Sequence, residues 1–323
     1  MTAMLFSAHV MLVVCACLLD AWLGDPVYRL HPVRLLGDGS QLCERWLFRL
    51  HLQGYLGGVL HWLAVVGGAL AVWWGMGTLL GALHPWLAWL WDLLLAYSLL
   101  CMRDLYAHGL RVYQALGDLV QARRALAMMV GRDTDSLDQG GVVRASIESL
   151  SENLTDGVLT PLWALCLFGL PGLIVVKAVS TLDSMVGYKT APYQRFGWAA
   201  ARADDLVHWL PARLSVPLIM LAAGLMRLHP LTAYHTARRD HGHLASPNSG
   251  WSEAAFAGAL QVRLLGPIRY RGELRNQEYL GDPAWPADLN ARHLQQALKL
   301  LLSCMALAVM IGLGLALLAS GWR

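Results

Sequence analysis

The stretch that decides the fold is ASIESLSENLTDG at 145–157, which runs into twenty uncharged residues at 157–176 and is followed by TLDSMVGY at 181–188. An uncharged apolar run of about 20 residues is long enough to span a membrane. Carboxylates this close to such a run are costly to bury, so they need a reason such as a cation or a phosphate-bearing substrate. The sequence therefore predicts an ion- or phosphate-handling site at the edge of a membrane.

The composition indicates a membrane protein. Hydrophobic residues make up 56% of the chain and charged residues only 15%, whereas soluble domains carry roughly 25% charged residues. We expect an all-α, polytopic integral membrane protein with about four to six membrane helices, counting re-entrant half-helices, in a single membrane-embedded domain over 1–323. The predicted membrane segments are 5–20, 56–80, 86–102, 157–178, 212–227 and 299–319.

Two of these segments are interrupted. Segment 157–178 carries Leu170-Pro171-Gly172, which predicts a break into two half-helices, and segment 212–227 is short and contains Pro217. If both crossed the membrane, the five basic residues of 177–213 would lie outside, against the positive-inside rule. Either that stretch is an exception or both segments are re-entrant or interfacial, and we favour the second. The predicted helical cytoplasmic segments are then 24–55, 103–156, 179–211 and 228–298.

Three carboxylates stand four residues apart in the deciding stretch. Glu148, Glu152 and Asp156 would fall within an arc of about 80° on a helix, where they repel each other unless a cation or a basic partner neutralises them. A solvated helix face is the ordinary explanation of such a stripe. This stripe runs into an apolar segment and includes Asn153, so we favour a metal or magnesium–phosphate site, for which oxygen ligands are suited.

The second polar stretch carries both carboxylates and bases. Its carboxylates would complete a cation site, and its bases are natural phosphate contacts, arginine through its bidentate fork. For any one of these residues an ordinary salt bridge is the simpler interpretation, but the set as a whole favours a site. The charged residues concerned are Asp183, Lys189, Arg195, Arg202, Asp204 and Asp205.

Two further stretches add candidate binding residues. Arg238, Asn248 and Trp251 precede a helix predicted over 254–262, which Ser252 would cap. A helix N-terminus of this kind is suited to an anion. The N-terminal loop adds Asp25 and His31. The six cysteines have no zinc-site spacing, the net charge of +3 comes with no basic run suited to nucleic acid, and no glycine-rich phosphate-loop motif is present.

At these residues the chain resembles a known family. LGDP (23–26) with HP (31–32), ESLSENLTDG (148–157), TLDSMVGY (181–188), FGWAAARADD (196–205), LPARL (210–214) and SPNSGW (246–251) are similar, in this order, to the motifs of the adenosylcobinamide-phosphate synthases of cobalamin biosynthesis, the CobD/CbiB proteins. The resemblance covers most of the chain. One departure is Ser180, where the family commonly has Asn.

The resemblance implies an enzyme of the inner cell membrane with its active site facing the cytoplasm. It would join aminopropanol or its O-phosphate to adenosylcobyric acid through an amide bond, using ATP and Mg²⁺. Glu148, Glu152, Asp156 and Asp183 would hold Mg²⁺, Arg202 with Asp204 or Asp205 would act in catalysis, and substrates and phosphates would be bound by Asp25, His31, Asn153, Tyr188, Lys189, Arg195, Arg238, Asn248 and Trp251.

Two other functional classes stay open. A corrinoid or small-anion transporter would use the same half-helices and intramembrane polar groups. A non-catalytic membrane scaffold would instead gather other cobalamin-pathway enzymes through segments 103–156 and 227–299. We place the enzyme first, because the carboxylates and bases cluster in segments predicted to be cytoplasmic, where a soluble substrate reaches them.

Overall fold

Helices account for most of the chain in the computed structural model, which describes residues 2–270, 273–276 and 278–321. Residues 271–272 and 277 of the predicted cytoplasmic segment 228–298 lie outside the described residues. The expectation of an all-α protein is confirmed, with four short strands between Leu264 and Leu280 as the exception among the described residues. The chain divides into two compact units, one formed by 1–101, 160–207 and 309–323 and the other by 102–159 and 208–308. A single domain over 1–323 stays a prediction.

Five helical stretches of the described chain are long and apolar enough to cross a membrane. They are Tyr55–Leu83, Pro85–Ala115, Gln139–Val186, Trp198–Leu225 and Ala291–Leu318. The predicted segments 56–80, 86–102 and 157–178 lie within them, and 299–319 lies within the last helix, which continues to Gly321. These helices confirm a multi-pass membrane protein. The predicted segment 5–20 lies in α1 (Thr2–Leu23).

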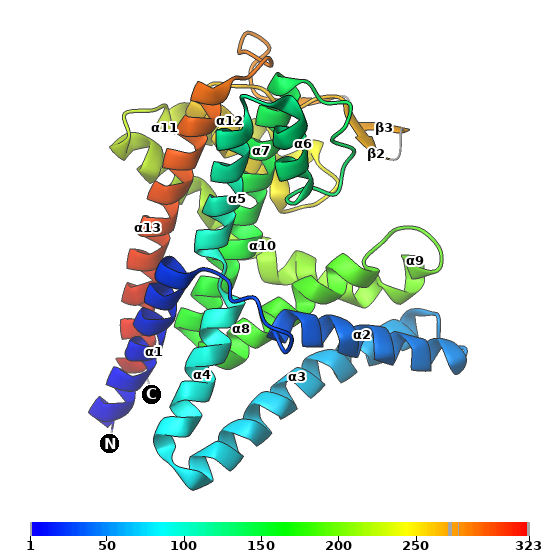
Figure 1. Ribbon diagram of the computed structural model, residues 1–323, viewed down its shortest axis with the longest axis vertical. Helices are drawn as coiled ribbons and strands as arrows, with labels where there is room; N and C mark the ends of the chain where they lie inside the picture. The colour runs from blue at the N-terminus through cyan, green and yellow to red at the C-terminus, as the bar shows by residue number, and fades with distance from the viewer. Residues whose placement is uncertain (1, 271–272, 277, 322–323) are drawn as a thin grey trace. The chain divides into compact units, whose positions relative to one another are not determined.

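The first unit contains a helical hairpin formed by α3 (Tyr55–Leu83) and α4 (Pro85–Leu99) (Figure 1). The turn is made by His84, whose side chain accepts a hydrogen bond from the backbone N–H of Trp86, with Pro85 at the first helical position. Asp92, the one charge of α4, accepts a 2.8 Å hydrogen bond from the indole N–H of Trp73. A polar group on a membrane helix thus finds its partner within the hairpin.

Helix α8 (Thr160–Val186) breaks close to where the sequence predicts it. The non-helical residue is Gly169, with φ 72° and ψ −163°, two residues before Pro171. A positive φ is readily adopted only by glycine, and the proline ring has no N–H for the helical ladder. The predicted break at 170–172 is therefore confirmed, one residue earlier than expected.

The predicted segments 179–211 and 212–227 share one long helix. After α9 (Tyr193–Phe196), the structure has α10 (Trp198–Leu225), which contains both Pro211 and Pro217. The alanine-rich start of α10 has high helix propensity. Each proline removes only one ladder hydrogen bond, which a membrane helix tolerates. The predicted catalytic residues therefore lie on the same helix as the short apolar segment, whose place in the membrane stays a prediction.

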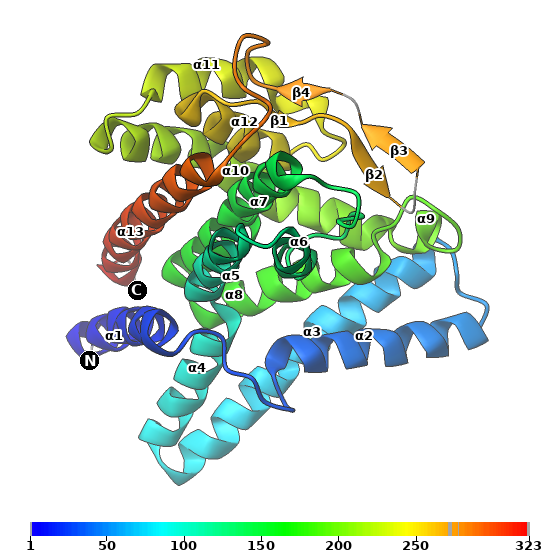
Figure 2. The same cartoon turned by 45° about the horizontal axis from the view of Figure 1, so that its top comes forward.

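The second unit is built around α12 (Ser249–Leu260), which is buried at every residue except Trp251. Helix α12 contacts α7 (Gln139–Asn153) and α11 (Pro230–Asp240), and Figure 2 shows α11 and α12 side by side. The remaining elements of this unit are α5 (Met102–Ala115), α6 (Leu119–Ala127), η2 (His241–His243), β1 (Leu264–Leu265), β2 (Ile268–Tyr270), β3 (Glu273–Asn276) and β4 (Tyr279–Leu280), with parts of α10 and α13 (Ala291–Gly321). Strand β1 pairs antiparallel with β4, and β2 with β3.

The acidic stripe does not continue on a regular α-helix. Helix α7 ends at Asn153, and Leu154–Leu159 form a π-helix that contains Asp156. The predicted spacing on one α-helical face therefore holds for Glu148 and Glu152 but not for Asp156. A π-helical turn of this kind often marks a functional site.

In the first unit, α9 approaches α8 so closely that only glycine fits at its end. A Cβ atom at Gly197 would lie 1.7 Å from the backbone oxygen of Val186. We expect Gly197→Ala to force a backbone shift and to destabilise the protein by about 1–3 kcal/mol or more. The matched control is Gly67→Ala on α3, where a Cβ would meet nothing within 4 Å. The midpoint of thermal unfolding in detergent should fall for the first variant and not for the second. Equal midpoints would contradict the close approach.

Candidate functional site

The second unit buries a carboxylate that has two partners. Glu148 on α7 is 2% exposed, and its Oε2 lies 2.5 Å from Nη2 of Arg132, in the loop before α7. Its Oε1 accepts a 2.7 Å hydrogen bond from the backbone N–H of Leu265 in β1. Both oxygens are therefore engaged by the protein. The metal role predicted for Glu148 stays a prediction, but the observed contacts favour a structural role for this residue.

Three more carboxylates lie near this ion pair, and together with Glu148 they form what we call the acidic cluster. Glu152 and Asp156 follow along α7 and the π-helix, and Glu253 comes from α12 with 2% of its surface exposed. Within the described residues, Glu253 has no hydrogen-bond or ion-pair partner. Burial raises the pKa of Glu253 well above its ordinary value, and the nearby charges of Glu152 and Glu148 raise it further, while Arg132 opposes them. Sequence analysis missed Glu253, because its neighbours lie about a hundred residues away along the chain.

The other predicted members of the stripe have partners nearby. Asp156 lies 3.4 Å from Nδ1 of His208, a buried histidine of α10. The amide of Asn153 turns back along α7 and donates to the backbone oxygen of Ser149 at 2.8 Å. The structure therefore brings Asp156 to the acidic cluster, whereas Asn153 is occupied by its own helix.

The donors of the acidic cluster fit Mg²⁺ only as part of a metal–phosphate complex. Within the described residues, no group of three or more His, Cys, Asp or Glu side chains is arranged to hold a metal ion. Magnesium usually binds through one or two carboxylates together with waters and substrate phosphates. Glu152 and Asp156 suit that donor set, and Glu148 does not, because its oxygens are already engaged.

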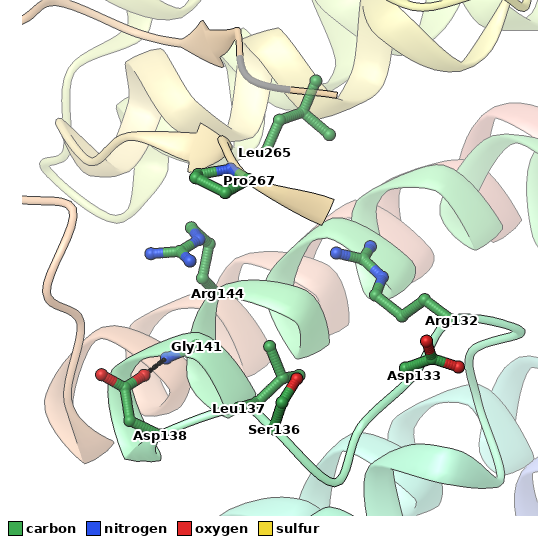
Figure 3. A pocket seen from close by; sticks show the side chains of 9 residues that line it. All are labelled: Arg132, Asp133, Ser136, Leu137, Asp138, Gly141, Arg144, Leu265 and Pro267. Atoms are coloured by element: carbon green, nitrogen blue, oxygen red, sulfur yellow. Dashed lines mark hydrogen bonds between the residues drawn. The ribbon is translucent and has the colours of Figure 1, made fainter. Parts of the chain in front are cut away.

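A pocket of about 310 Å³ opens beside the start of α7 (Figure 3). Arg132 and Arg144 both line it, and Arg144 donates a 2.9 Å hydrogen bond to the backbone oxygen of Ala287. Asp138 caps α7 by accepting a 2.7 Å hydrogen bond from the N–H of Gly141. The remaining lining residues are Asp133, Ser136, Leu137, Leu265 and Pro267. Two guanidinium groups at one pocket are typical of phosphate or carboxylate recognition.

Sequence analysis missed both pocket arginines. The local signal was Asp138-Gln-Gly-Gly, a helix cap followed by two small residues, which indicates a helix start but no ligand.

A second cluster brings together two of the predicted binding residues. Arg213 on α10 donates a 3.3 Å hydrogen bond to Oδ1 of Asn248, and its Cζ lies 5.4 Å from the ring centre of Trp251. The ring of Trp251 stacks on His241 at 3.8 Å. Arg238, predicted to join them, is exposed in the last turn of α11. Arg213 was missed as a site residue, because its motif was interpreted only as part of a membrane segment.

The first unit holds the predicted N-terminal pair. Nε2 of His31 lies 2.9 Å from Oδ1 of Asp25, and Nδ1 of His31 accepts a hydrogen bond from the N–H of Val33. His31 thereby caps α2 (Pro32–Arg49). The two motif residues are thus in contact, while their role in substrate binding stays a prediction.

The second polar stretch also lies in the first unit. A Cβ at Gly187 would lie 2.0 Å from Oδ1 of Asp183, so glycine is required beside this carboxylate. The hydroxyl of Tyr188 donates to the backbone oxygen of Ser184 at 2.9 Å. Lys189 and Arg195 are exposed, as predicted phosphate contacts need to be.

The predicted catalytic residues stand on the first turns of α10. Nη1 of Arg202 and Oδ2 of Asp205 form an exposed ion pair at 3.1 Å, and Asp204 is half-buried. An exposed pair of this kind contributes little to stability. Because Asp183 and these residues belong to one unit and the acidic cluster to the other, their joint action stays a prediction.

Comparison with known proteins identifies the relatives of the chain. Residues 13–301 match the family model described as CobD/Cbib protein. The chain is 45% identical over 272 residues to the cobalamin biosynthesis protein CobD of Photorhabdus laumondii subsp. laumondii, which covers 83% of this chain and 85% of that protein. It is 38% identical over 304 residues to the cobalamin biosynthesis protein CbiB of Salmonella typhimurium, covering 92% and 94%. No solved structure matches the chain.

Glu253→Gln is expected to stabilise the fold at neutral and alkaline pH. Because the pKa of Glu253 is raised in the folded state, the folded protein keeps a proton that the unfolded chain releases, and wild-type stability falls as the pH rises above the ordinary glutamate range. Glutamine does not titrate, so the gain in unfolding midpoint should be small at about pH 4 and grow to a few degrees by about pH 8.

The measurement is the midpoint of thermal unfolding in detergent across this pH range, with Glu278→Gln as the exposed control. A difference between Glu253→Gln and wild type that does not change with pH would contradict the raised pKa.

Proposed function

The chain belongs to the CobD/CbiB family of cobalamin biosynthesis proteins, and we propose that it is a carbon–nitrogen ligase that joins aminopropanol, or its O-phosphate, to adenosylcobyric acid. The reaction would consume ATP and require Mg²⁺. The observation that supports this chemistry is the pocket lined by Arg132 and Arg144 beside a buried group of carboxylates in the second unit. A ligase that handles phosphates needs both kinds of group.

The proposed reaction has two steps that balance. A carboxylate oxygen of the corrinoid attacks the γ-phosphorus of ATP, which forms an acyl phosphate and releases ADP. The amine nitrogen then attacks the acyl carbon, the carbon–oxygen bond to phosphate breaks, and an amide, inorganic phosphate and a proton are released. The phosphorylation is needed because a carboxylate is a poor electrophile, and phosphate is a good leaving group.

Residues of this chain are assigned to these steps by their chemistry. Glu152 and Asp156 would hold Mg²⁺, which when bound neutralises charge on the phosphate oxygens. Asp204 or Asp205 would accept the proton of the amine. Exposed cations would bind phosphate groups and stabilise the charge that develops in transfer, namely Arg202, Arg195 and Lys189.

The remaining binding residues suit a corrinoid. Trp251 offers an aromatic surface and Asn248 a polar amide, and Arg213 contacts both. By the positive-inside rule, the basic segments support an active site on the cytoplasmic side of the inner membrane. There it would meet its soluble substrates and other enzymes of the pathway.

The first test is turnover by the full-length protein purified in detergent. We expect adenosylcobyric acid, aminopropanol O-phosphate, ATP and Mg²⁺ to give an amide product in mass spectrometry, with no product when ATP or Mg²⁺ is left out. A folded protein that binds the corrinoid but makes no amide would contradict the ligase and favour the transporter or scaffold.

Glu152→Gln is expected to lower kcat/KM by roughly 100-fold, because an amide replaces the carboxylate that would hold the metal. The matched control is Glu278→Gln, which changes an exposed glutamate of the same unit and should leave turnover unchanged. Unfolding midpoints show whether both variants fold. Wild-type turnover by Glu152→Gln would remove this residue from the metal site.

A further inference from the structure

We propose that the pocket beside the start of α7 binds a substrate through its phosphate group, with Arg144 as the principal contact and the phosphorylated amino alcohol as the ligand. The inference rests on the proposed function for the identity of the substrate. It adds a binding site for the phosphate, and two arginines that hold it, which sequence motifs did not indicate.

Arg144 has the properties of a ligand-binding arginine. Within the described residues its guanidinium forms no salt bridge, and its one hydrogen bond is the donation to the backbone oxygen of Ala287. It is half-buried, on a rigid helix, and it lines the pocket. Glu148 acts on this charge only through space, since its oxygens bond to Arg132 and Leu265, and the Arg144 Cζ lies 5.9 Å from the ring centre of Tyr279. A phosphate would supply a direct partner in bidentate geometry.

Arg132 supplies a second guanidinium whose position is fixed. Its ion pair with the buried Glu148 holds it at the pocket wall without freedom to turn away. Figure 3 shows Arg132 and Arg144 reaching the pocket from the loop before α7 and from α7 itself. Groups held in place before binding lose little conformational entropy when the ligand arrives.

The other charges of the pocket favour a small zwitterion. Asp133 and Asp138, the cap of α7, both line the pocket, so the site does not present positive charge alone. A triphosphate would bring several negative charges to this carboxylate, whereas an amino alcohol phosphate brings an ammonium group with its phosphate. The volume of about 310 Å³ stands at the lower end of ligand pockets and suits a small molecule.

The test compares Arg144→Gln with a matched arginine that does not line the pocket. Arg111 on α5, in the same unit, also donates to a backbone oxygen, that of Ala107, at 3.3 Å, and neither residue lines the pocket, so Arg111→Gln is the control. Isothermal titration of the full-length protein in detergent measures binding of aminopropanol O-phosphate, aminopropanol and ATP. We expect Arg144→Gln to weaken binding of aminopropanol O-phosphate by roughly 10- to 100-fold, and Arg144→Lys to restore part of it.

Each outcome decides the assignment. The phosphate site would be overturned if Arg144→Gln and Arg111→Gln bound the amino alcohol phosphate equally well and both bound ATP as the wild type does. Weakened binding of ATP alone would support a phosphate site but overturn the amino alcohol as its ligand. Binding can be measured without turnover. If the wild-type protein bound the amino alcohol phosphate but formed no amide, and Arg144→Gln lost that binding, the pocket would be upheld and the ligase contradicted. If Arg144→Gln instead formed the amide normally, with an unchanged KM for the amine, the ligase would be upheld and the pocket assignment contradicted.

Discussion

The rest of the second unit depends on one constraint, the burial of a carboxylate inside α7. Removing the ionised side chain of Glu148 from water costs several kcal/mol, and the fold offsets this with Arg132 and with the backbone N–H of Leu265. Leu265 adopts φ 59°, which is uncommon for a residue other than glycine, and this conformation accompanies its hydrogen bond to Glu148. Because both partners line the same pocket, the ion pair that stabilises the unit also shapes the site.

The sequence predicted the apolar helices well and the segments between them less well. Composition and length decide whether a segment spans a membrane, so 56–80 and 299–319 fall within observed helices. Gly169 shows why a proline locates a break only approximately, since the residue that changes conformation is the one that can adopt a positive φ. Helix α10 continues through both Pro211 and Pro217, so a change from polar to apolar residues within it, at about 212, marks no end of the helix.

The site was predicted where its residues are neighbours in sequence and missed where they are not. Asn248 and Trp251 stand in one motif, and so do Glu152 and Asp156, so spacing alone placed each pair in a common site. Glu253 reaches the acidic cluster from α12, and no local pattern connects it with residues of α7. Arg144 was missed for a related reason, because an isolated arginine at a helix start indicates nothing until the fold surrounds it with a pocket.

The acidic cluster is unbalanced in charge, and that imbalance is a reason to expect function there. Arg132 is already paired with Glu148, and the raised pKa of Glu253 favours its protonated form, so the excess negative charge of the cluster falls on Glu152 and Asp156. A fold selected for stability alone would relieve this repulsion with neutral side chains, since buried like charges destabilise. A metal ion or a substrate ammonium group would bring the positive charge that the cluster lacks. Relief of the repulsion would then add to the binding free energy of that ligand. The acidic cluster would therefore bind cations in preference to neutral ligands, although its repulsion lowers the stability of the unliganded protein.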